Sequence, residues 1–362
     1  MPLDLPDFPW DELAAPARTA REHPDGIVDL SVGSPVDPTP EVVRVALAAA
    51  TDAHGYPATA GTPALREAIV AWFARRRGVT DLTVEDVLPT IGSKEIVALL
   101  PTLLGLGAED VIVRPTLAYP TYAVGAALAG ARSVAADDPD DWPEGTRLVW
   151  LNTPRNPDGD VLSVPFLARV VERAREVGAI VASDECYAEL DWRGEGPSPS
   201  VLDPQVTGGT RRGILSVYSL SKQSNLAGYR SAFVAGGRDL VARLLLARKH
   251  AGLIPPAPVQ AATAAALGDD AHVRAQRRLY RARRERLAAA LAGAGFRLEG
   301  GDAGLYLWAT RDEDCWASVA ALADRGILVA PGSFYGAAGA GHVRVALTAT
   351  DERIDAAVRR LS

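Results

Sequence analysis

The sequence predicts an α/β fold, with a mostly parallel sheet in a large domain and a smaller α/β domain beside it. Short apolar runs rich in β-branched residues, such as residues 87–91, 148–151 and 179–183, alternate with stretches of helical periodicity. Polar residues follow several of these runs directly, and the carboxyl ends of parallel strands share one edge of a sheet. The chain of 362 residues is long enough for two or three domains with buried cores.

The division between the two domains is expected near residue 250. A helical pattern over residues 239–251 ends before Gly252 and a pair of prolines, and shorter strand patterns follow. We therefore expect residues 36–250 to form the large domain, and residues 1–35 and 251–362 to form an N-terminal arm and the small domain. Strands of the small domain are expected at residues 296–298, 304–308, 327–330 and 343–346.

Composition and charge exclude several classes of protein. Apolar residues make up 48% of the chain and charged residues 23%, which is ordinary for a soluble globular protein. A net charge of -7 without a basic run argues against nucleic-acid binding, and the arginine-rich helix over residues 272–293 is expected to present a solvated face. No apolar run approaches the length of a membrane span. The five histidines lack ligand spacing, so we expect no metal site.

The cysteines and the N-terminus bear on the compartment. Cys186 and Cys315 are too few for a disulfide framework, although the sequence leaves one isolated disulfide open. The first ten residues are acidic and proline-rich, unlike a signal peptide. We therefore expect a cytoplasmic protein.

The most informative stretch is residues 214–230, where an apolar run ends in two serines, a lysine and, eight positions later, an arginine. Lys222 is one of three lysines in a chain that otherwise uses arginine for positive charge. A lysine amine can lose its proton, whereas a guanidinium cannot. Schiff-base chemistry requires such an amine, so Lys222 is a candidate for covalent catalysis. The alternative is an ordinary solvated lysine at the end of a strand.

This stretch resembles the active-site lysine segment of the class I/II aminotransferases, which are fold-type I enzymes that depend on pyridoxal 5'-phosphate. The family pattern is Ser-x-Ser-Lys followed by Gly-x-Arg, and it is matched here by residues 219–222 and 228–230. The resemblance implies that Lys222 bonds covalently to the cofactor. Hydroxyl groups and a planar guanidinium suit a phosphate dianion. By the same resemblance, the cofactor phosphate is held by Ser219, Ser221 and Arg230.

Two further segments match the family at its phosphate site. Between a strand and an apolar helix, residues 92–94 offer free N–H groups at a positive dipole end, and the family places its phosphate cup at this junction. The resemblance therefore makes cofactor-binding candidates of Gly92, Ser93 and Lys94. Tyr56 opens a Tyr-x4-Gly-x3-Leu-Arg segment, in which the family's tyrosine reaches the phosphate bound by the neighbouring subunit. This match implies a homodimer with shared active sites.

Four residues match positions that surround the cofactor ring in the family. Tyr119 would stack on the ring, although the preceding proline lies further away than usual, which leaves the register of this loop open. Asn156 and Tyr187 would contact the phenolic oxygen. Asp184 would pair with the ring nitrogen, and an anion is needed there because a protonated ring accepts electrons from the substrate.

The family's substrate-binding positions are also matched. Gly33, in a Gly-Ser-Pro loop, would bring its backbone N–H to the substrate carboxylate. Arg344 would clamp the same carboxylate, since planar bidentate recognition favours arginine. The substrate-binding candidates are thus Gly33, Asn156 and Arg344.

The resemblance implies an aminotransferase that moves an amino group between an amino acid and 2-oxoglutarate. The chain as a whole is most similar to the actinobacterial type of succinyldiaminopimelate aminotransferase, so N-succinyl-L,L-2,6-diaminopimelate, a precursor in lysine biosynthesis, is the expected donor. The alternatives are an aminotransferase for another amino acid, a carbon–sulfur lyase on the same fold, or a cofactor-binding regulatory module, which would need an added DNA-binding domain. No residue in the sequence identifies what selects the distal end of the substrate.

Overall fold

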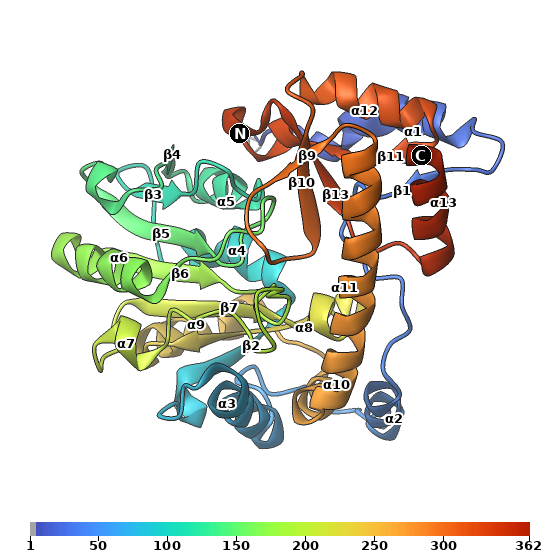
Figure 1. Cartoon of the computed structure of the whole chain (residues 1–362). Coiled ribbons are helices and arrows are strands. Elements are labelled where there is room, and N and C mark those ends of the chain that lie inside the picture. Colours follow the sequence, from blue (N-terminus) through green and yellow to red (C-terminus); the bar gives the residue numbers. More distant parts are fainter. Residues whose placement is uncertain (1–4) are drawn as a thin grey trace.

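A large sheet with helices on both faces forms one side of the molecule (Figure 1). The computed structural model describes residues 5–362, so the first four residues of the expected arm lie outside the described part. The strands are β2 (Val87–Ile91), β3 (Val111–Arg114), β4 (Arg132–Ala135), β5 (Thr146–Asn152), β6 (Ile180–Asp184), β7 (Ile214–Ser219) and β8 (Ser231–Gly236). Their order across the sheet is β2-β8-β7-β6-β5-β3-β4.

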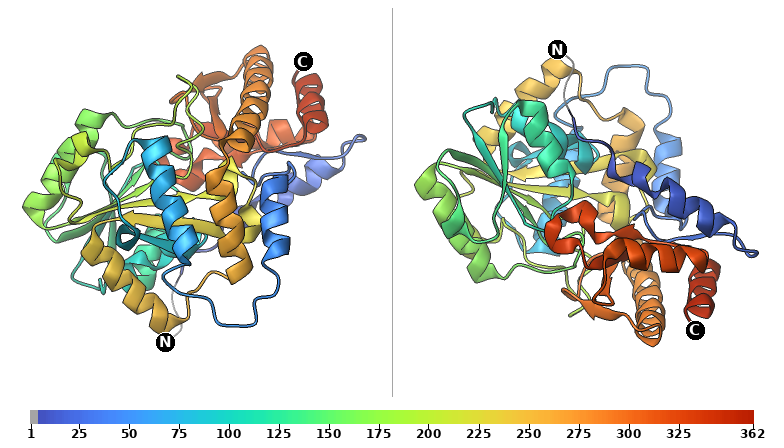
Figure 2. Two further views of the ribbon diagram at one scale, coloured as in Figure 1. Left: turned by 90° about the horizontal axis from the view of Figure 1, so that it is seen from below. Right: turned by 90° about the horizontal axis from the view of Figure 1, so that it is seen from above.

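Two apolar cores hold the helices against this sheet. In the first core, Trp72 and Phe73 pack on Tyr218 and Phe233, and the covering helices are α3 (Pro63–Arg77), α6 (Val164–Val177), α7 (Pro204–Thr207) and α10 (Ala257–Gly268). On the opposite face the helices are α4 (Ser93–Leu103), α5 (Thr121–Ala129) and α9 (Arg238–Ala251). Helix α2 (Glu41–Ala49) adds Val43 to the first core and packs against α10, as the view from below shows (Figure 2).

The rest of the chain forms a smaller α/β unit beside the large sheet. Its strands are β1 (Val28–Asp29), β9 (Arg297–Glu299), β10 (Tyr306–Thr310), β11 (Ile327–Leu328), β12 (Ala330–Pro331) and β13 (His342–Ala346). Its helices are α1 (Ala14–Arg21), α11 (Asp270–Gly293), α12 (Cys315–Asp324) and α13 (Asp351–Leu361). β12-β13-β10-β9 is an antiparallel sheet, and β1 pairs in parallel with β11, so the N-terminal segment lies against the C-terminal part (Figure 2). The expected domain limits at residues 36 and 250 stay a prediction.

Four parallel strands end at the same edge of the large sheet, and each ends on a polar residue. Asn152 and Asp184 are direct partners in the register of β5 and β6. β2 points in the same direction as β7, because both are antiparallel to β8. The polar ends are Arg114 of β3, Asn152 of β5, Asp184 of β6 and Ser219 of β7.

Among the described residues, β8 is the only strand of the large sheet that runs in the opposite direction, so its beginning lies at this same edge. Ser231 pairs with Ile91 at the end of β2, and Ala232 pairs with Ser219 at the end of β7. Arg230 immediately precedes β8. The reversed strand therefore brings this arginine between the ends of two strands that are distant in the sequence.

The arginine-rich helix α11 differs in part from its prediction. The expected solvated face is present at Arg274 and Arg278, which are exposed, but Arg277 and Arg283 are buried. Arg283 donates to both carboxylate oxygens of Asp37, at 2.7 and 2.6 Å, and Arg277 donates to the carbonyl oxygen of Asp191. Helical periodicity places charges on a face without revealing whether acidic groups from other segments cover them, and here they do.

Two further structural facts concern expectations from the sequence. Cys186 and Cys315 are buried and free, so the isolated disulfide that the sequence left open is not formed. None of the helices within residues 5–362 is long and apolar enough to cross a membrane.

Replacing Asp37 by alanine should destabilise the fold, because the buried guanidinium of Arg283 keeps only the half-exposed Asp351 as an acidic partner. We expect the free energy of unfolding at neutral pH to fall by about 3 kcal/mol in a urea titration. Burial alone would raise the pKa of Asp37, but hydrogen bonds from Arg283 and Gln276 outweigh it and hold that pKa below its ordinary value.

The sign of that shift fixes the pH dependence. A carboxyl group with a depressed pKa stabilises the fold above its unfolded pKa and loses that contribution as the pH falls through the folded pKa. The difference between wild type and Asp37→Ala should therefore narrow below about pH 4. Asp52→Ala, at a fully exposed carboxylate, is the control and should change nothing. If the difference in the free energy of unfolding did not change with pH, the charge of Asp37 would not be what stabilises the fold.

Candidate active site

A cavity of about 950 Å³ lies at the polar edge of the large sheet. It is lined by the ends of the strands, by residues of the small unit, and by the N-terminal segment 5–10. Most of the residues singled out in the sequence line it, namely Gly33, Ser93, Lys94, Tyr119, Asn156, Asp184, Tyr187, Ser219, Ser221, Lys222, Arg230 and Arg344. Gly92 lies just behind the wall, whereas Tyr56 is fully exposed and does not line the cavity.

Lys222 is presented by a single helical turn, α8 (Leu220–Gln223), which follows β7 directly. The hydroxyl of Ser219 caps this turn by accepting a hydrogen bond from the backbone N–H of Ser221, at 3.1 Å. The amine of Lys222 donates to the carbonyl oxygen of Gly33. Burial lowers the pKa of Lys222, since a charged amine is costly away from water. This amine therefore loses its proton more readily than a surface lysine does.

Asp184 is a buried carboxylate at the end of β6. It accepts hydrogen bonds from the hydroxyl of Tyr122, at 3.0 Å, and from the backbone N–H of Cys186, at 3.2 Å. Asn152 holds its backbone by donating to the carbonyl oxygen of Asp184, at 2.9 Å. Burial raises the pKa of Asp184, and no basic side chain of residues 5–362 forms an ion pair with it. A buried carboxylate is costly when no cation faces it, so the site suits a positively charged N–H group.

Hydrogen-bond donors gather at the edge of the sheet where β2 and β7 end and β8 begins. Gly92 has φ +76°, and a Cβ on it would lie 2.1 Å from Nη2 of Arg230, so the guanidinium occupies the space that a side chain would fill. Ser219 donates its hydroxyl to Ser221, at 2.9 Å. Arg230 itself has φ 54°, a left-handed conformation that costs a non-glycine residue about 1 kcal/mol and is typical of functional sites. Helix α4 begins beside this group at Ser93 and adds its free N–H groups.

Arg344 lies on β13 of the small unit and lines the same cavity. Its Nη1 donates to Oδ1 of Asn156, at 3.0 Å, and its Nη2 donates to the carbonyl oxygen of Ser31, at 2.6 Å. The guanidinium carbon lies 3.8 Å from the ring centroid of Tyr306. The Nε atom is buried without a hydrogen-bond partner in the described part of the chain. Arg344 is thus held flat on an aromatic ring with donor capacity to spare.

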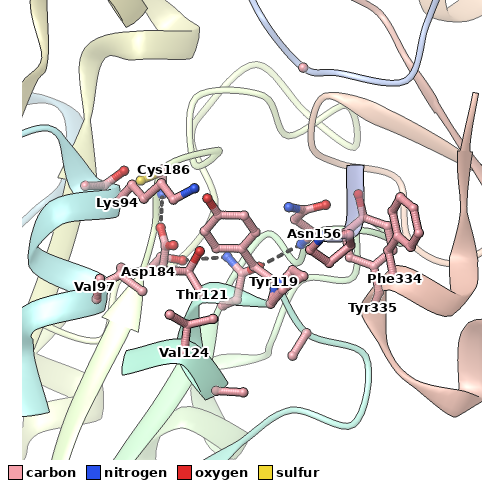
Figure 3. Close-up of a pocket in the computed structure, with 18 of the residues that line it drawn as sticks. Lys94, Val97, Tyr119, Thr121, Val124, Asn156, Asp184, Cys186, Phe334 and Tyr335 are labelled. Atoms are coloured by element: carbon pink, nitrogen blue, oxygen red, sulfur yellow. Dashed lines mark hydrogen bonds between the residues drawn. The ribbon is translucent and has the colours of Figure 1, made fainter. Parts of the chain in front are cut away.

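Tyr119 stands in the middle of the cavity wall (Figure 3). Its ring meets that of Tyr122 edge to face, with centroids 6.0 Å apart, and Tyr122 lies fully buried behind it. The first tyrosine of the motif therefore faces the cavity, and the second hydrogen-bonds Asp184. The register of this loop relative to the family's stays a prediction.

Several residues of this site were not predicted from the sequence. The hydroxyl of Tyr306 lies 3.2 Å from the hydroxyl of Tyr187. A Cβ on Gly33 would lie 2.2 Å from the hydroxyl oxygen of Tyr306. Tyr306 was assigned only to a strand, because alternation along a strand does not tell which face meets a cavity. Phe8 and Trp10 of the N-terminal segment also line the cavity, and their role depends on tertiary packing that no local pattern encodes.

The chain is similar to known proteins of one family. The chain matches the family model for aminotransferase class I and II over residues 25–361. It is 60% identical over 359 residues to a probable aminotransferase of Mycobacterium tuberculosis, which covers 99% of this chain and 85% of the relative. It is 56% identical over 360 residues to the 4-dedimethylamino-4-oxo-anhydrotetracycline transaminase OxyQ of Streptomyces rimosus, which covers 99% of both chains.

More distant relatives share the fold. An LL-diaminopimelate aminotransferase of Gloeobacter violaceus is 36% identical over 380 residues, which cover 99% of this chain and 95% of that protein. The solved structure of a probable N-succinyldiaminopimelate aminotransferase from Thermus thermophilus aligns with a TM-score of 0.87 at 31% identity, covering 98% of this chain and 99% of the other. The chain therefore belongs to the class I and II aminotransferases, a family of fold-type I enzymes that depend on pyridoxal phosphate.

Proposed function

We propose that this aminotransferase transfers the amino group of N-succinyl-L,L-2,6-diaminopimelate to 2-oxoglutarate, in the synthesis of diaminopimelate and lysine. The observation that carries the reaction is that the buried amine of Lys222, the carboxylate of Asp184 and the guanidinium of Arg344 line one cavity. The diaminopimelate aminotransferases among its relatives and structural neighbours support this choice of substrate.

The residues of the cavity fit pyridoxal phosphate. Asp184 is a buried carboxylate that has no cationic partner within the described chain, so it is free to pair with a protonated ring nitrogen. Arg230 fills the space beside Gly92, next to the N-terminus of α4, where a phosphate is favoured. The residues proposed to hold the cofactor are Gly92, Ser93, Lys94, Tyr119, Asn156, Asp184, Tyr187, Ser219, Ser221, Lys222 and Arg230.

When bound, pyridoxal phosphate supplies an aldehyde that captures the substrate amine and a ring that accepts the electrons of its Cα–H bond. Lys222 would hold the cofactor covalently, and its amine, once free, would take the proton from the substrate Cα. The lowered pKa of Lys222 supports this role, because only the uncharged amine accepts a proton. Asp184 would stabilise a positive charge on the ring nitrogen, and Tyr119 would cover the ring and exclude water.

Arg344 and Gly33 are proposed to bind the α-carboxylate of the substrate. Arg344 lies on Tyr306 and bonds Asn156, so its plane is fixed before a ligand arrives. A preorganised guanidinium loses less entropy on binding than a free side chain does. Orientation by this clamp would place the substrate Cα within reach of Lys222.

A second candidate substrate is a ketone on a polycyclic compound. The Streptomyces relative named as an anhydrotetracycline transaminase is 56% identical, more similar than the diaminopimelate aminotransferase at 36%. The wide cavity and the aromatic side chains of Phe8, Trp10 and Phe334 in its wall would accommodate such a ring system.

The homodimer and the cytoplasmic location are part of this proposal. Tyr56 is fully exposed and does not line the cavity of its own chain, so a second copy is needed if it is to reach a phosphate site. Val32, Val36, Val42 and Val45 are also exposed. A second copy would cover them and present its own Tyr56 to the phosphate site. The free cysteines support a reducing compartment.

A panel of amino donors with 2-oxoglutarate tests the substrate. Donors should bleach the absorbance of the holoenzyme, with N-succinyl-L,L-2,6-diaminopimelate giving the highest kcat/KM, and glutamate should form. Lys222→Ala should lower kcat by at least about 10³-fold, since it removes both the covalent attachment and the proton carrier. Turnover of Lys222→Ala at the wild-type rate would refute its role. Release of pyruvate and ammonia without a keto acid would identify a lyase instead.

Gly92→Ala should weaken cofactor binding, because its Cβ would displace the guanidinium of Arg230. We expect the Kd for pyridoxal phosphate, measured by titration of the apoenzyme, to rise by about tenfold or more, as expected for loss of one charged hydrogen bond. Gly78→Ala is the matched control, since Gly78 also has a positive φ, at +68°, but nothing lies within 4 Å of its Cβ position. If both variants lose stability but bind the cofactor equally, Arg230 does not hold the phosphate.

Hybrid dimers test the shared site. When Lys222→Ala and Tyr56→Ala subunits are co-expressed, a hybrid dimer contains one site with both an intact Lys222 and, from the other subunit, an intact Tyr56. Activity should then rise clearly above the sum of the two variants measured alone. If Tyr56 acted on the site of its own chain, every hybrid site would lack one group and the activities would only add.

A further inference from the structure

Arg114 ends β3 and lines the cavity, yet it has no acidic partner within residues 5–362. Its Nε donates to Oγ of Ser133, at 3.2 Å, and its Nη1 donates to the carbonyl oxygen of Pro115, at 3.1 Å. Burial lowers its pKa, and no neighbouring carboxylate opposes that shift. The guanidinium is therefore half-buried, positively charged and not neutralised by the described chain.

The fully buried arginines outside the cavity are paired with carboxylates, whereas the half-buried Arg114 is not. Each of those forms an ion pair with a carboxylate, namely Arg77 with Glu185, Arg248 with Glu95, Arg277 with Glu195 and Arg283 with Asp37. The pattern follows from the cost of an uncompensated charge away from water. Arg66 and Arg360 are also half-buried and bond only carbonyl oxygens, but they lie outside the cavity. The position of Arg114 in the cavity wall is what makes its unpaired charge available to a ligand.

The other arginines of the cavity share this property. Arg344 bonds Asn156 and a carbonyl oxygen, and Arg230 bonds the carbonyl oxygen of Ala227, but neither forms an ion pair with a carboxylate in the described part of the chain. In the proposed function both have anionic ligands, the α-carboxylate for Arg344 and the phosphate for Arg230. Arg114 is then a third cavity arginine for which the proposed function names no anion.

We propose that Arg114 binds a second carboxylate, carried at the distal end of the substrate. The inference rests on the proposed function, in which Arg344 takes the α-carboxylate. Nη2 and the remaining N–H of Nη1 can donate in parallel to a carboxylate, the geometry in which arginine binds best. Val97, Val124 and Phe334 line the same cavity and offer apolar contact to a methylene chain (Figure 3). The substrate class is thus an amino acid with a carboxylate at the end of an extended side chain.

Arg114 and Arg344 stand on different parts of the fold, which supports separate anion subsites. Arg114 ends β3 of the large sheet, whereas Arg344 lies on β13 of the small one. Their hydrogen-bond partners do not overlap. A substrate held at both ends would bridge the two sheets, so its chain length and its distal charge would be read together.

Two pairs of probes that differ only at the distal end test this subsite. L-2-aminoadipate carries a carboxylate where L-norleucine carries a methyl group, and the same holds for adipate and hexanoate. Arg114→Gln should weaken the binding of the two dicarboxylates, aminoadipate and adipate, by about 10- to 100-fold, the loss expected for a hydrogen-bonded charge pair. The same variant should bind norleucine and hexanoate as the wild type does. The readouts are bleaching of the holoenzyme by each amino acid without a keto acid, and calorimetric binding of the two unreactive acids.

Two further variants serve as controls. Arg132→Gln removes the same charge from an exposed position on β4 and should change neither probe pair. Arg114→Lys keeps the charge without the planar fork and should retain part of the preference for dicarboxylates, which also keeps the test informative if Arg114→Gln does not fold.

The outcomes separate this inference from the proposed function. Arg114 does not bind a distal carboxylate if Arg114→Gln weakens the binding of both members of a pair equally. The same conclusion follows if the wild type does not prefer adipate to hexanoate. Equal weakening is the result expected if Arg114 instead pairs with a carboxylate of a second copy. If no amino donor bleaches the holoenzyme, the proposed function fails instead. Adipate and hexanoate bind without turnover, so their binding still shows in that case whether Arg114 binds a distal carboxylate.

Discussion

The site depends on one constraint, the direction of the strands in the large sheet. Parallel strands bring their carboxyl ends to one edge, and β8 runs against them, so that its beginning meets the same edge. Asp184 and Ser219 arrive there as strand ends, and Arg230 arrives as the residue before β8. Had β8 been parallel, Arg230 would lie at the far edge, and the group of hydrogen-bond donors next to α4 could not form.

Helix α11 then fixes how two loops of the site face each other. His272, Gln276, Tyr280 and Arg283 recur at helical spacing and form a stripe on one face of α11. The stripe bonds the loop after Lys222, through Ser224 and Asn225, and the loop after Gly33, through Asp37. The amine of Lys222 and its acceptor, the carbonyl oxygen of Gly33, are therefore placed by a single rigid element. A long helix serves this purpose because its side chains hold fixed relative positions.

Local motifs allowed much of the architecture and the members of the cavity to be predicted from sequence. Lys222, Asp184 and Arg344 each follow or lie in an apolar run whose neighbours are distinctive, and the structure brings all three to one cavity. β4 was missed because this edge strand is only half-buried and has no apolar run. Tyr306 and Arg114 escaped because their significance lies in what surrounds them, a second hydroxyl in one case and a missing carboxylate in the other. Such properties arise only when distant segments meet.

Two cations of the cavity are tuned in opposite directions by their surroundings. Lys222 must give up its proton to act on a substrate, and burial lowers its pKa. Arg344 must remain charged to hold a carboxylate, and although burial opposes its charge, the tyrosines around it outweigh this effect and raise its pKa. Its delocalised guanidinium also stacks on Tyr306, which a compact ammonium could not do as well. Exchanging the two residue types would place a permanent charge where a base is needed and a titratable amine where an anchor is needed. The scarcity of lysine in this chain is therefore consistent with a need for an amine, and not merely for a positive charge, at position 222.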